Sequence, residues 1–172
     1  MGRPEMTPED RSLIFRLAVV PGGPPPISRQ DFLEQFGAPD GVALGLQLLR
    51  DAIGRRDGVD VEYALTVCFT FGFTEDHLPL LLSLATAEWH QRHEDVASAL
   101  DDLRSPRSVD ALTHLAEWVP AYLQFDDARA LAVKAIWALG NIGTAAARNV
   151  LRSLAQSPDA IVANNARDQL AR

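Results

Sequence analysis

The sequence predicts an all-α protein, an α-solenoid of about four antiparallel helix pairs with an N-terminal helical extension. Apolar residues recur at spacings of three and four along most of the chain, as in helices buried on one face. No segment shows the apolar–polar alternation that predicts a strand. A set of apolar positions also recurs along the chain at two intervals, each of which spans a pair of helices. Intervals of that length are typical of stacked helical repeats.

Length and composition agree with one short repeat array. The chain has 172 residues, of which 47% are hydrophobic, so it can bury a core. Charged residues make up 23% and are mixed in sign, which excludes a disordered chain. The single cysteine, Cys68, excludes an intrachain disulfide framework and a multi-cysteine zinc site.

The N-terminal part of the chain is predicted to be a leader. Thr7 and Pro8 form an N-cap and first-turn proline pair, which predicts a helix over about 8–19, although residues 17–20 could instead be extended. The proline- and glycine-rich residues 21–26 can neither continue a helix nor lie in a central strand. We therefore expect a leader over residues 1–27 and a repeat domain over residues 28–172.

The later helices each begin at a capping residue or a proline. They are predicted at about 29–36, 41–55, 61–71, 75–89, 94–104, 106–118, 127–140, 145–156 and 158–171. Asp40 and Asp60 are the expected caps of the second and third of these, with Gly58 as the break between them. The expected inward residues of those two helices are Val42, Leu46, Leu49 and Ile53, then Val61, Leu65, Cys68 and Phe69.

The internal repeat locates one insertion. After a shorter interval, the apolar positions Leu65, Phe69, Leu81 and Leu84 recur as Val96, Leu100, Leu112 and Leu115. A longer interval then leads to Ala135, Leu139, Leu151 and Leu154, and a second shorter interval leads to Ala166 and Leu170. The longer interval implies an insertion near 118–126, where Pro120 also predicts an irregular segment. Stacked helix pairs share one core and leave a curved face of helices open to a partner.

One segment resembles a known family. Residues 129–144, Arg-Ala-Leu-Ala-Val-Lys-Ala-Ile-Trp-Ala-Leu-Gly-Asn-Ile-Gly-Thr, are similar to the A…A-x-x-A-L-G-x-I-G signature of HEAT repeats, in the short type named after phycobilisome lyases. Small alanines let helices approach, and Gly140 and Gly143 are expected to form the turn. The match is weaker over 93–118, where Asp102 and Arg104 replace the turn glycines. The resemblance implies an α-solenoid.

Charge is distributed unevenly along the chain. The net charge of −7 divides into −3 over residues 1–74, −8 over 75–127 and +4 over 128–172. An acidic middle repels phosphate backbones and attracts basic proteins, so we expect a basic protein partner and no nucleic acid. We see no signal peptide and no apolar run of membrane-spanning length, and we expect a cytoplasmic protein without membrane contact.

The polar clusters do not predict an enzyme. His90, His93 and Glu94 lie close in sequence, but a zinc helix places two histidines four residues apart with a glutamate between them. Cys68 lies on an apolar helix with no basic neighbour to lower the pKa of its thiol, which favours a buried, inert side chain. We therefore expect no catalytic residues, no metal and no cofactor.

We predict that a partner binds the second helices of the pairs. The candidate binding residues are Glu62, Glu94, Asp95, Asp101, Asp102 and Trp137. Like charges on one helix face cost stability unless a basic partner offsets them, and tryptophan is frequent among binding hot spots. The alternative is that these carboxylates only solvate the helix.

The sequence leaves three functions open. A non-catalytic protein-binding module fits best, and the segments DFLEQFG, DGVALGLQLLRDAI, AEWHQRHEDVASALDDLRSP and AIWALGNIGT resemble small bacterial HEAT-like proteins regarded as immunity partners of secreted toxins. That resemblance implies an inhibitor of a basic toxin. The alternatives are a bilin lyase-like accessory protein and a helical-repeat nucleic-acid-binding protein. Both of these alternative functions need a cationic surface. The sequence does not predict the oligomeric state.

Overall fold

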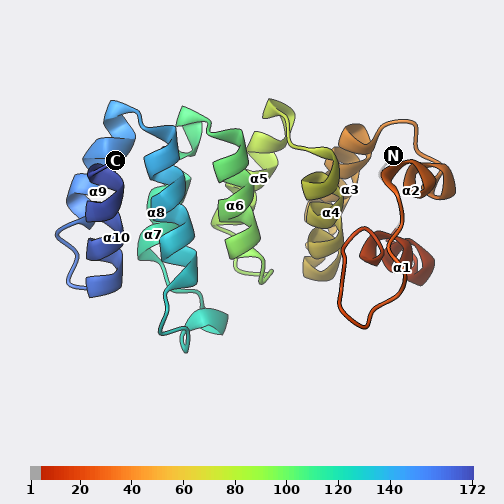
Figure 1. Ribbon diagram of the computed structural model, residues 1–172, viewed down its shortest axis with the longest axis horizontal. Helices are drawn as coiled ribbons and strands as arrows, with labels where there is room; N and C mark the ends of the chain where they lie inside the picture. Colours follow the sequence, from red (N-terminus) through yellow and green to blue (C-terminus); the bar gives the residue numbers. More distant parts are fainter. Residues whose placement is uncertain (1–4) are drawn as a thin grey trace. The chain divides into compact units, whose positions relative to one another are not determined.

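The computed structural model describes residues 5–172, and all regular secondary structure in that range is helical (Figure 1). The all-α prediction is confirmed. Residues 1–4 of the predicted leader lie outside the described residues. Every helix between residues 5 and 172 is too short or too polar to cross a membrane.

The chain forms two compact units, which divide between Leu80 and Leu81. This division does not test the domain boundary predicted after residue 27. The helices of the first unit are α1 (Pro8–Phe15), α2 (Arg29–Phe36), α3 (Gly41–Arg55), α4 (Gly58–Phe71) and η1 (Glu75–His77), and α5 (Leu78–Ala85) spans the division.

In the first unit α3 packs along α4, and α1 also contacts α4. The two long helices approach closely at Gly45, where an added Cβ would lie 2.9 Å from the buried Sγ of Cys68. Ile14 of α1 is fully buried, so the helix of the predicted leader belongs to this core. Phe32 of α2 is also fully buried, with its ring centroid 5.8 Å from that of Phe71 in α4. The structure therefore builds the unit around a helix pair with α1 and α2 against it.

The second unit has the packing of an α-solenoid. Its helices are α6 (His93–Leu103), η2 (Pro106–Ser108), α7 (Val109–Glu117), η3 (Ala121–Leu123), α8 (Ala130–Ile142), α9 (Ala145–Leu154) and α10 (Ala160–Leu170). Helix α8 packs against α6 and α10, its equivalents in the neighbouring pairs, and against α7 and α9. Helices α6, α8 and α10 thus form one row (Figure 1), and the predicted solenoid is confirmed.

The repeat register describes the core well. Its buried positions are Leu65, Leu81, Leu84, Val96, Leu100, Leu112, Leu115, Ala135, Leu139, Leu151, Leu154 and Ala166. Phe69, predicted to point inward, is 41% exposed, and Leu170 is only partly buried. The predicted irregular insert is also present, since only the short η3 interrupts the chain between α7 and α8.

The inward face of α3 differs from the prediction by one residue. The buried residues are Gly41, Leu44, Gly45, Leu48, Leu49 and Ala52, whereas Val42, Leu46 and Ile53 are only partly buried. Both sets share helical spacing, so the pattern alone cannot separate them. The glycines decide the outcome, because residues of α4 pack where a Cβ at Gly41 or Gly45 would lie.

Several predicted helix ends were wrong. Asp57 caps α4, so Gly58 begins that helix and Asp60 lies inside it. Helix α8 begins at Ala130 and continues through Gly140. The side chain of Gln169 in α10 packs where a Cβ at Gly140 would lie, so glycine serves close packing here and not a turn. The turn is made by Gly143 alone, at φ 65°.

Three further helices are shorter than predicted, because one of their ends lies inside the predicted range. The first helix stops at Phe15 instead of residue 19, the helix predicted over 75–89 becomes η1 and a short α5, and Asp159 caps α10. Each end is set by a capping hydrogen bond or a tight turn, and several candidate caps lie close together in the sequence.

Candidate functional site

Helix α6 carries four carboxylates and no lysine or arginine. Glu94 and Asp95 lie in its first turn, where the positive end of the helix dipole stabilises them. Asp101 and Asp102 lie in its last turns, where the dipole has the opposite effect. The pKa of Asp102 is raised, first by partial burial and then by the neighbouring Asp101. The C-terminal end of α6 therefore favours a compensating donor or cation.

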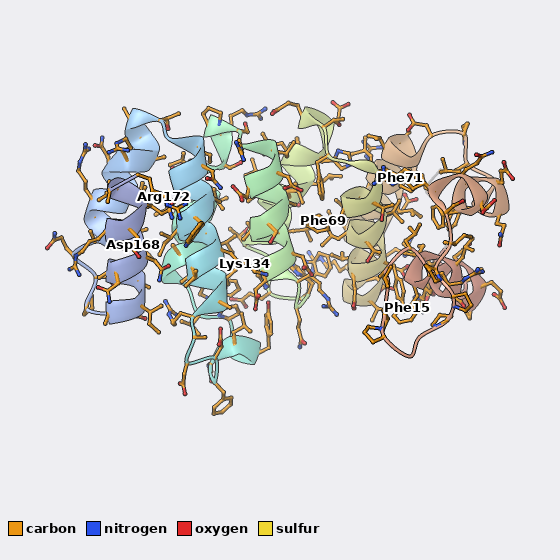
Figure 2. The ribbon with its side chains drawn as sticks, viewed as in Figure 1. Phe15, Phe69, Phe71, Lys134, Asp168 and Arg172 are labelled. Carbon is orange, nitrogen blue, oxygen red and sulfur yellow. The ribbon has the colours of Figure 1, made fainter. Side chains whose placement is uncertain are left out.

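Helix α8 pairs with two of these carboxylates. Lys134 Nζ lies 3.0 Å from Glu94 Oε2, and Asn141 Nδ2 donates to Asp101 Oδ1 at 2.8 Å. In both pairs the two partners are 40 residues apart in sequence, so α6 and α8 run alongside each other in constant register. Figure 2 shows Lys134 on the side of α8 that faces α6.

Trp137 of α8 is 37% exposed beside these pairs. Its Nε1–H donates to Asn165 Oδ1 of α10 at 3.2 Å, which fixes the orientation of the indole. The Arg172 guanidinium lies 4.1 Å from the ring centroid, and Figure 2 shows Arg172 beside α8. A cation thus already covers one of the most exposed aromatic groups of the second unit.

A depression of about 240 Å³ lies between α6 and α8. We call its lining, together with Glu94, the α6–α8 surface; its residues are Glu94, Ser98, Asp101, Val133, Lys134 and Trp137. The surface combines two carboxylates, one ammonium group and one indole. It can accept hydrogen bonds and stack against a planar cation, which are the contacts that a protein side chain makes.

The predicted site residues do not all meet on this surface. The structure brings Glu94, Asp101 and Trp137 together there. Asp95 and Asp102 each follow one of those carboxylates on α6, about 100° further around the helix. Glu62 lies on α4 and belongs to the first unit. Sequence reasoning missed Lys134, Asn141 and Arg172, although the shared spacing of the two pairs along the chain was a usable signal.

A second polar cluster is buried in the second unit. The imidazoles of His90 and His93 are stacked with centroids 4.1 Å apart. His90 Nε2 donates to the Leu84 carbonyl at 2.8 Å, and its Nδ1 accepts the Arg92 backbone N–H at 3.0 Å. A carbonyl can only accept and an N–H can only donate, so the His90 ring is neutral.

His93 is held in the same way. Its Nε2 donates to the Ala87 carbonyl at 2.8 Å, and its Nδ1 lies 2.9 Å from the hydroxyl of Tyr122 in η3. Burial, followed by the nearby His90, lowers the pKa of His93 to about 4. Burial also lowers the pKa of His90. Both rings use both nitrogens to anchor loops, which leaves them no coordination capacity for a metal.

The remaining aromatic groups complete this packing. Trp118 contacts His93 edge-on at 4.9 Å and stacks on His114 at 5.0 Å, and Trp89 contacts His90 at 5.3 Å. Among residues 5–172 no group of three or more histidine, cysteine, aspartate or glutamate side chains is placed to hold a metal ion.

Cys68 is fully buried on α4, as predicted. Burial raises the pKa of its thiol to about 12, so the thiolate is not populated near neutral pH. The thiol therefore lacks the ionised form that a nucleophile requires.

Comparison with known families identifies the helix pair next to the depression. Residues 131–157, which cover most of α8 and all of α9, match the family model described as PBS lyase HEAT-like repeat. The chain carries a HEAT-like repeat. The predicted resemblance is confirmed at this HEAT-like repeat, whose first helix bears Lys134, Trp137 and Asn141. No curated protein and no solved structure matches the chain.

Proposed function

We propose that this helical-repeat protein is a non-catalytic binding module that grips a basic protein partner with the α6–α8 surface. The observation that supports this most is the exposed indole of Trp137 beside the carboxylate of Asp101, around one depression on a row of stacked helices. Stacked repeats use such rows of helices as extended binding surfaces. Tryptophan is enriched among binding hot spots, and the rim around such an anchor is polar.

The electrostatics of α6 support a basic partner. Asp101 and Asp102 lie at the unfavourable end of the helix dipole, and partial burial raises the pKa of Asp102. Lys134 and Asn141 compensate Glu94 and Asp101 in the free protein. An exposed ion pair of this kind contributes about 0–1 kcal/mol, so a partner's cation can exchange with Lys134 at small cost.

Of the residues that the sequence predicts, Glu94, Asp101 and Trp137 form the centre of the proposed contact set, with Asp95 and Asp102 beside them on α6. Glu62 lies on α4 in the first unit and is not part of this surface. An immunity-type inhibitor that covers the basic groove of a toxin in the cytoplasm is one form of this function. The bilin-binding and nucleic-acid-binding alternatives require cations, and α6 supplies none.

The test begins with recovery of a partner and ends with purified components. Wild-type protein, Trp137→Ala and the double variant Asp101→Asn/Asp102→Asn would each be used to isolate binding proteins from the source cells. The partner that the wild type retains would then be purified and its affinity measured by calorimetry at two salt concentrations. Asp110→Asn, an exposed carboxylate on α7, is the matched control.

We expect a basic partner whose affinity falls at least ten-fold with Trp137→Ala and falls with rising salt, because a hot-spot residue contributes about 2 kcal/mol or more. The double variant should weaken binding more than Asp110→Asn. Equal affinity for all four proteins, or a partner that is acidic, would refute the proposed surface.

A further inference from the structure

We propose that the depression beside Trp137 binds an arginine side chain of the partner, and that Arg172, whose guanidinium stacks on the same indole, opposes this binding in the free protein. This inference rests on the proposed function and specifies the chemical group that the surface recognises. A guanidinium is planar and weakly hydrated, so it stacks on tryptophan better than an ammonium group does.

The indole is already arranged for a cation. Trp137 Nε1 donates a hydrogen bond of 3.2 Å to Asn165 Oδ1, which fixes the plane of the indole ring. The ring therefore loses little conformational freedom when a ligand stacks on it. Arg172 demonstrates the complementarity within the molecule, because its guanidinium lies 4.1 Å from the ring centroid. The protein thus contains a bound copy of the group that we expect a partner to supply.

Asp101 provides the matching anion. It lines the same depression as Trp137, and its Oδ1 accepts one hydrogen bond from Asn141 at 2.8 Å. A carboxylate offers about four lone-pair sites, so capacity remains for the N–H groups of a guanidinium. Stacking on an indole together with hydrogen bonding to a carboxylate is selective for arginine over lysine.

Arg172 then acts as a competitor. Two guanidinium groups that share one indole repel each other at short range, whether they stack on the same face or on opposite faces. A partner's arginine therefore binds against the charge of Arg172, which disfavours weakly interacting cations. Removal of Arg172 should consequently strengthen the binding of arginine.

Octa-arginine and octa-lysine peptides, which carry equal charge, provide the test. Dissociation constants for both would be measured on the full chain by calorimetry, and the Trp137 indole N–H would be followed by NMR. The variants are Arg172→Ala, Trp137→Ala and Trp137→Phe, the last of which keeps a ring if alanine destabilises the fold. Arg107→Ala, an exposed arginine of η2, is the matched control for loss of one positive charge.

We expect octa-arginine to shift the Trp137 resonance and to bind more tightly than octa-lysine. Arg172→Ala should tighten octa-arginine binding by about two- to five-fold beyond Arg107→Ala, the range that an exposed cation–π contact supports. Trp137→Ala should abolish the preference for arginine, and Trp137→Phe should reduce it.

Three results would each overturn the arginine site: equal effects of Arg172→Ala and Arg107→Ala, a preference for arginine that survives Trp137→Ala, or absence of octa-arginine binding. These failures remain distinct from failure of the proposed function, which depends on recovery of the partner and on its response to the Asp101→Asn/Asp102→Asn variant.

Discussion

Asp60 is a charged residue with no exposed surface inside α4. Arg11 donates to its Oδ1 from Nε at 3.0 Å and from Nη2 at 2.8 Å, and Arg55 Nη2 donates to its Oδ2 at 2.6 Å. The backbone N–H of Met6 also donates to this carboxylate, at 3.2 Å. One side chain therefore joins the N-terminal segment, α1, α3 and α4 within the first unit.

Asp60→Asn should lower the free energy of unfolding by about 3 kcal/mol, because two arginines lose their shared anion in a buried site. The figure lies at the low end for buried pairs, since Arg11 and Arg55 are 26% and 30% exposed and can be rehydrated. Urea denaturation would measure the change. Glu9→Gln, on the exposed surface of α1, should change it by less than about 0.5 kcal/mol. A loss below about 1 kcal/mol for Asp60→Asn would contradict the role assigned to this carboxylate.

Asp60 also shows what local reasoning misses. The sequence predicts Asp60 as the cap of this helix, but Asp57, three residues earlier, carries the same side chain and can equally accept the first backbone N–H groups. The structure selects Asp57, whose carboxylate accepts from Val59 and Asp60. Arg11 is 49 residues away from Asp60 in sequence, so no local pattern could assign the ion pair.

At the scale of the helix, the ends of α6 and α8 are equivalent positions with different residues. Arg104 ends α6 at φ 49° and ψ 30°, and Gly143 ends α8 at φ 65° and ψ 6°. Their separation in the sequence equals the longer of the two repeat intervals. Glycine adopts this left-handed conformation freely, whereas a residue with a Cβ is strained in it.

Arg104→Gly should therefore stabilise the protein by about 0.5–1 kcal/mol, and Gly143→Ala should destabilise it by about 1 kcal/mol or more. The opposite signs follow from one backbone geometry, and the melting temperatures of the two variants would measure them. Changes of the same sign would show that the turn conformation does not control these helix ends.

At the scale of the whole molecule, buried histidines make stability depend on pH. In the folded protein His90 and His93 are buried as neutral rings. The pKa of each lies below 6.5, and that of His93 is about 4. The titratable and charged groups around them include Arg92, His114 and the neutral hydroxyl of Tyr122, with Glu94 and Asp95 near that hydroxyl. The unfolded chain therefore binds more protons than the folded chain between about pH 6.5 and 4.

The free energy of unfolding should consequently fall as the pH is lowered from 7 to 5. Each histidine contributes a slope of up to about 1.4 kcal/mol per pH unit within this window. Denaturation at pH 7, 6 and 5 would measure the slope, and His93→Gln should reduce it, because glutamine does not titrate. A stability that is constant or increases toward pH 5 would be inconsistent with neutral, buried rings.

The charge pattern of the molecule shows what cannot be predicted by counting charged residues along the sequence. Sequence alone predicts an acidic middle segment, and the acids of α6 are indeed close together in the chain. The structure sets Lys134 and Asn141 against two of them and Arg172 over Trp137. The resulting surface is mixed in charge, since it combines residues that are distant in sequence.

The sequence by itself determined the helical class, the repeat interval, the insert before α8 and most of the buried positions. Those features follow from local periodicity, proline and glycine, whose effects extend over only a few residues. Tertiary structure alone decided which of two adjacent apolar stripes α3 buries, which aspartate enters an ion pair, and which cations meet the carboxylates of α6. Each of those outcomes depends on contacts between helices far apart in the chain, and a side chain's partner there is set by packing.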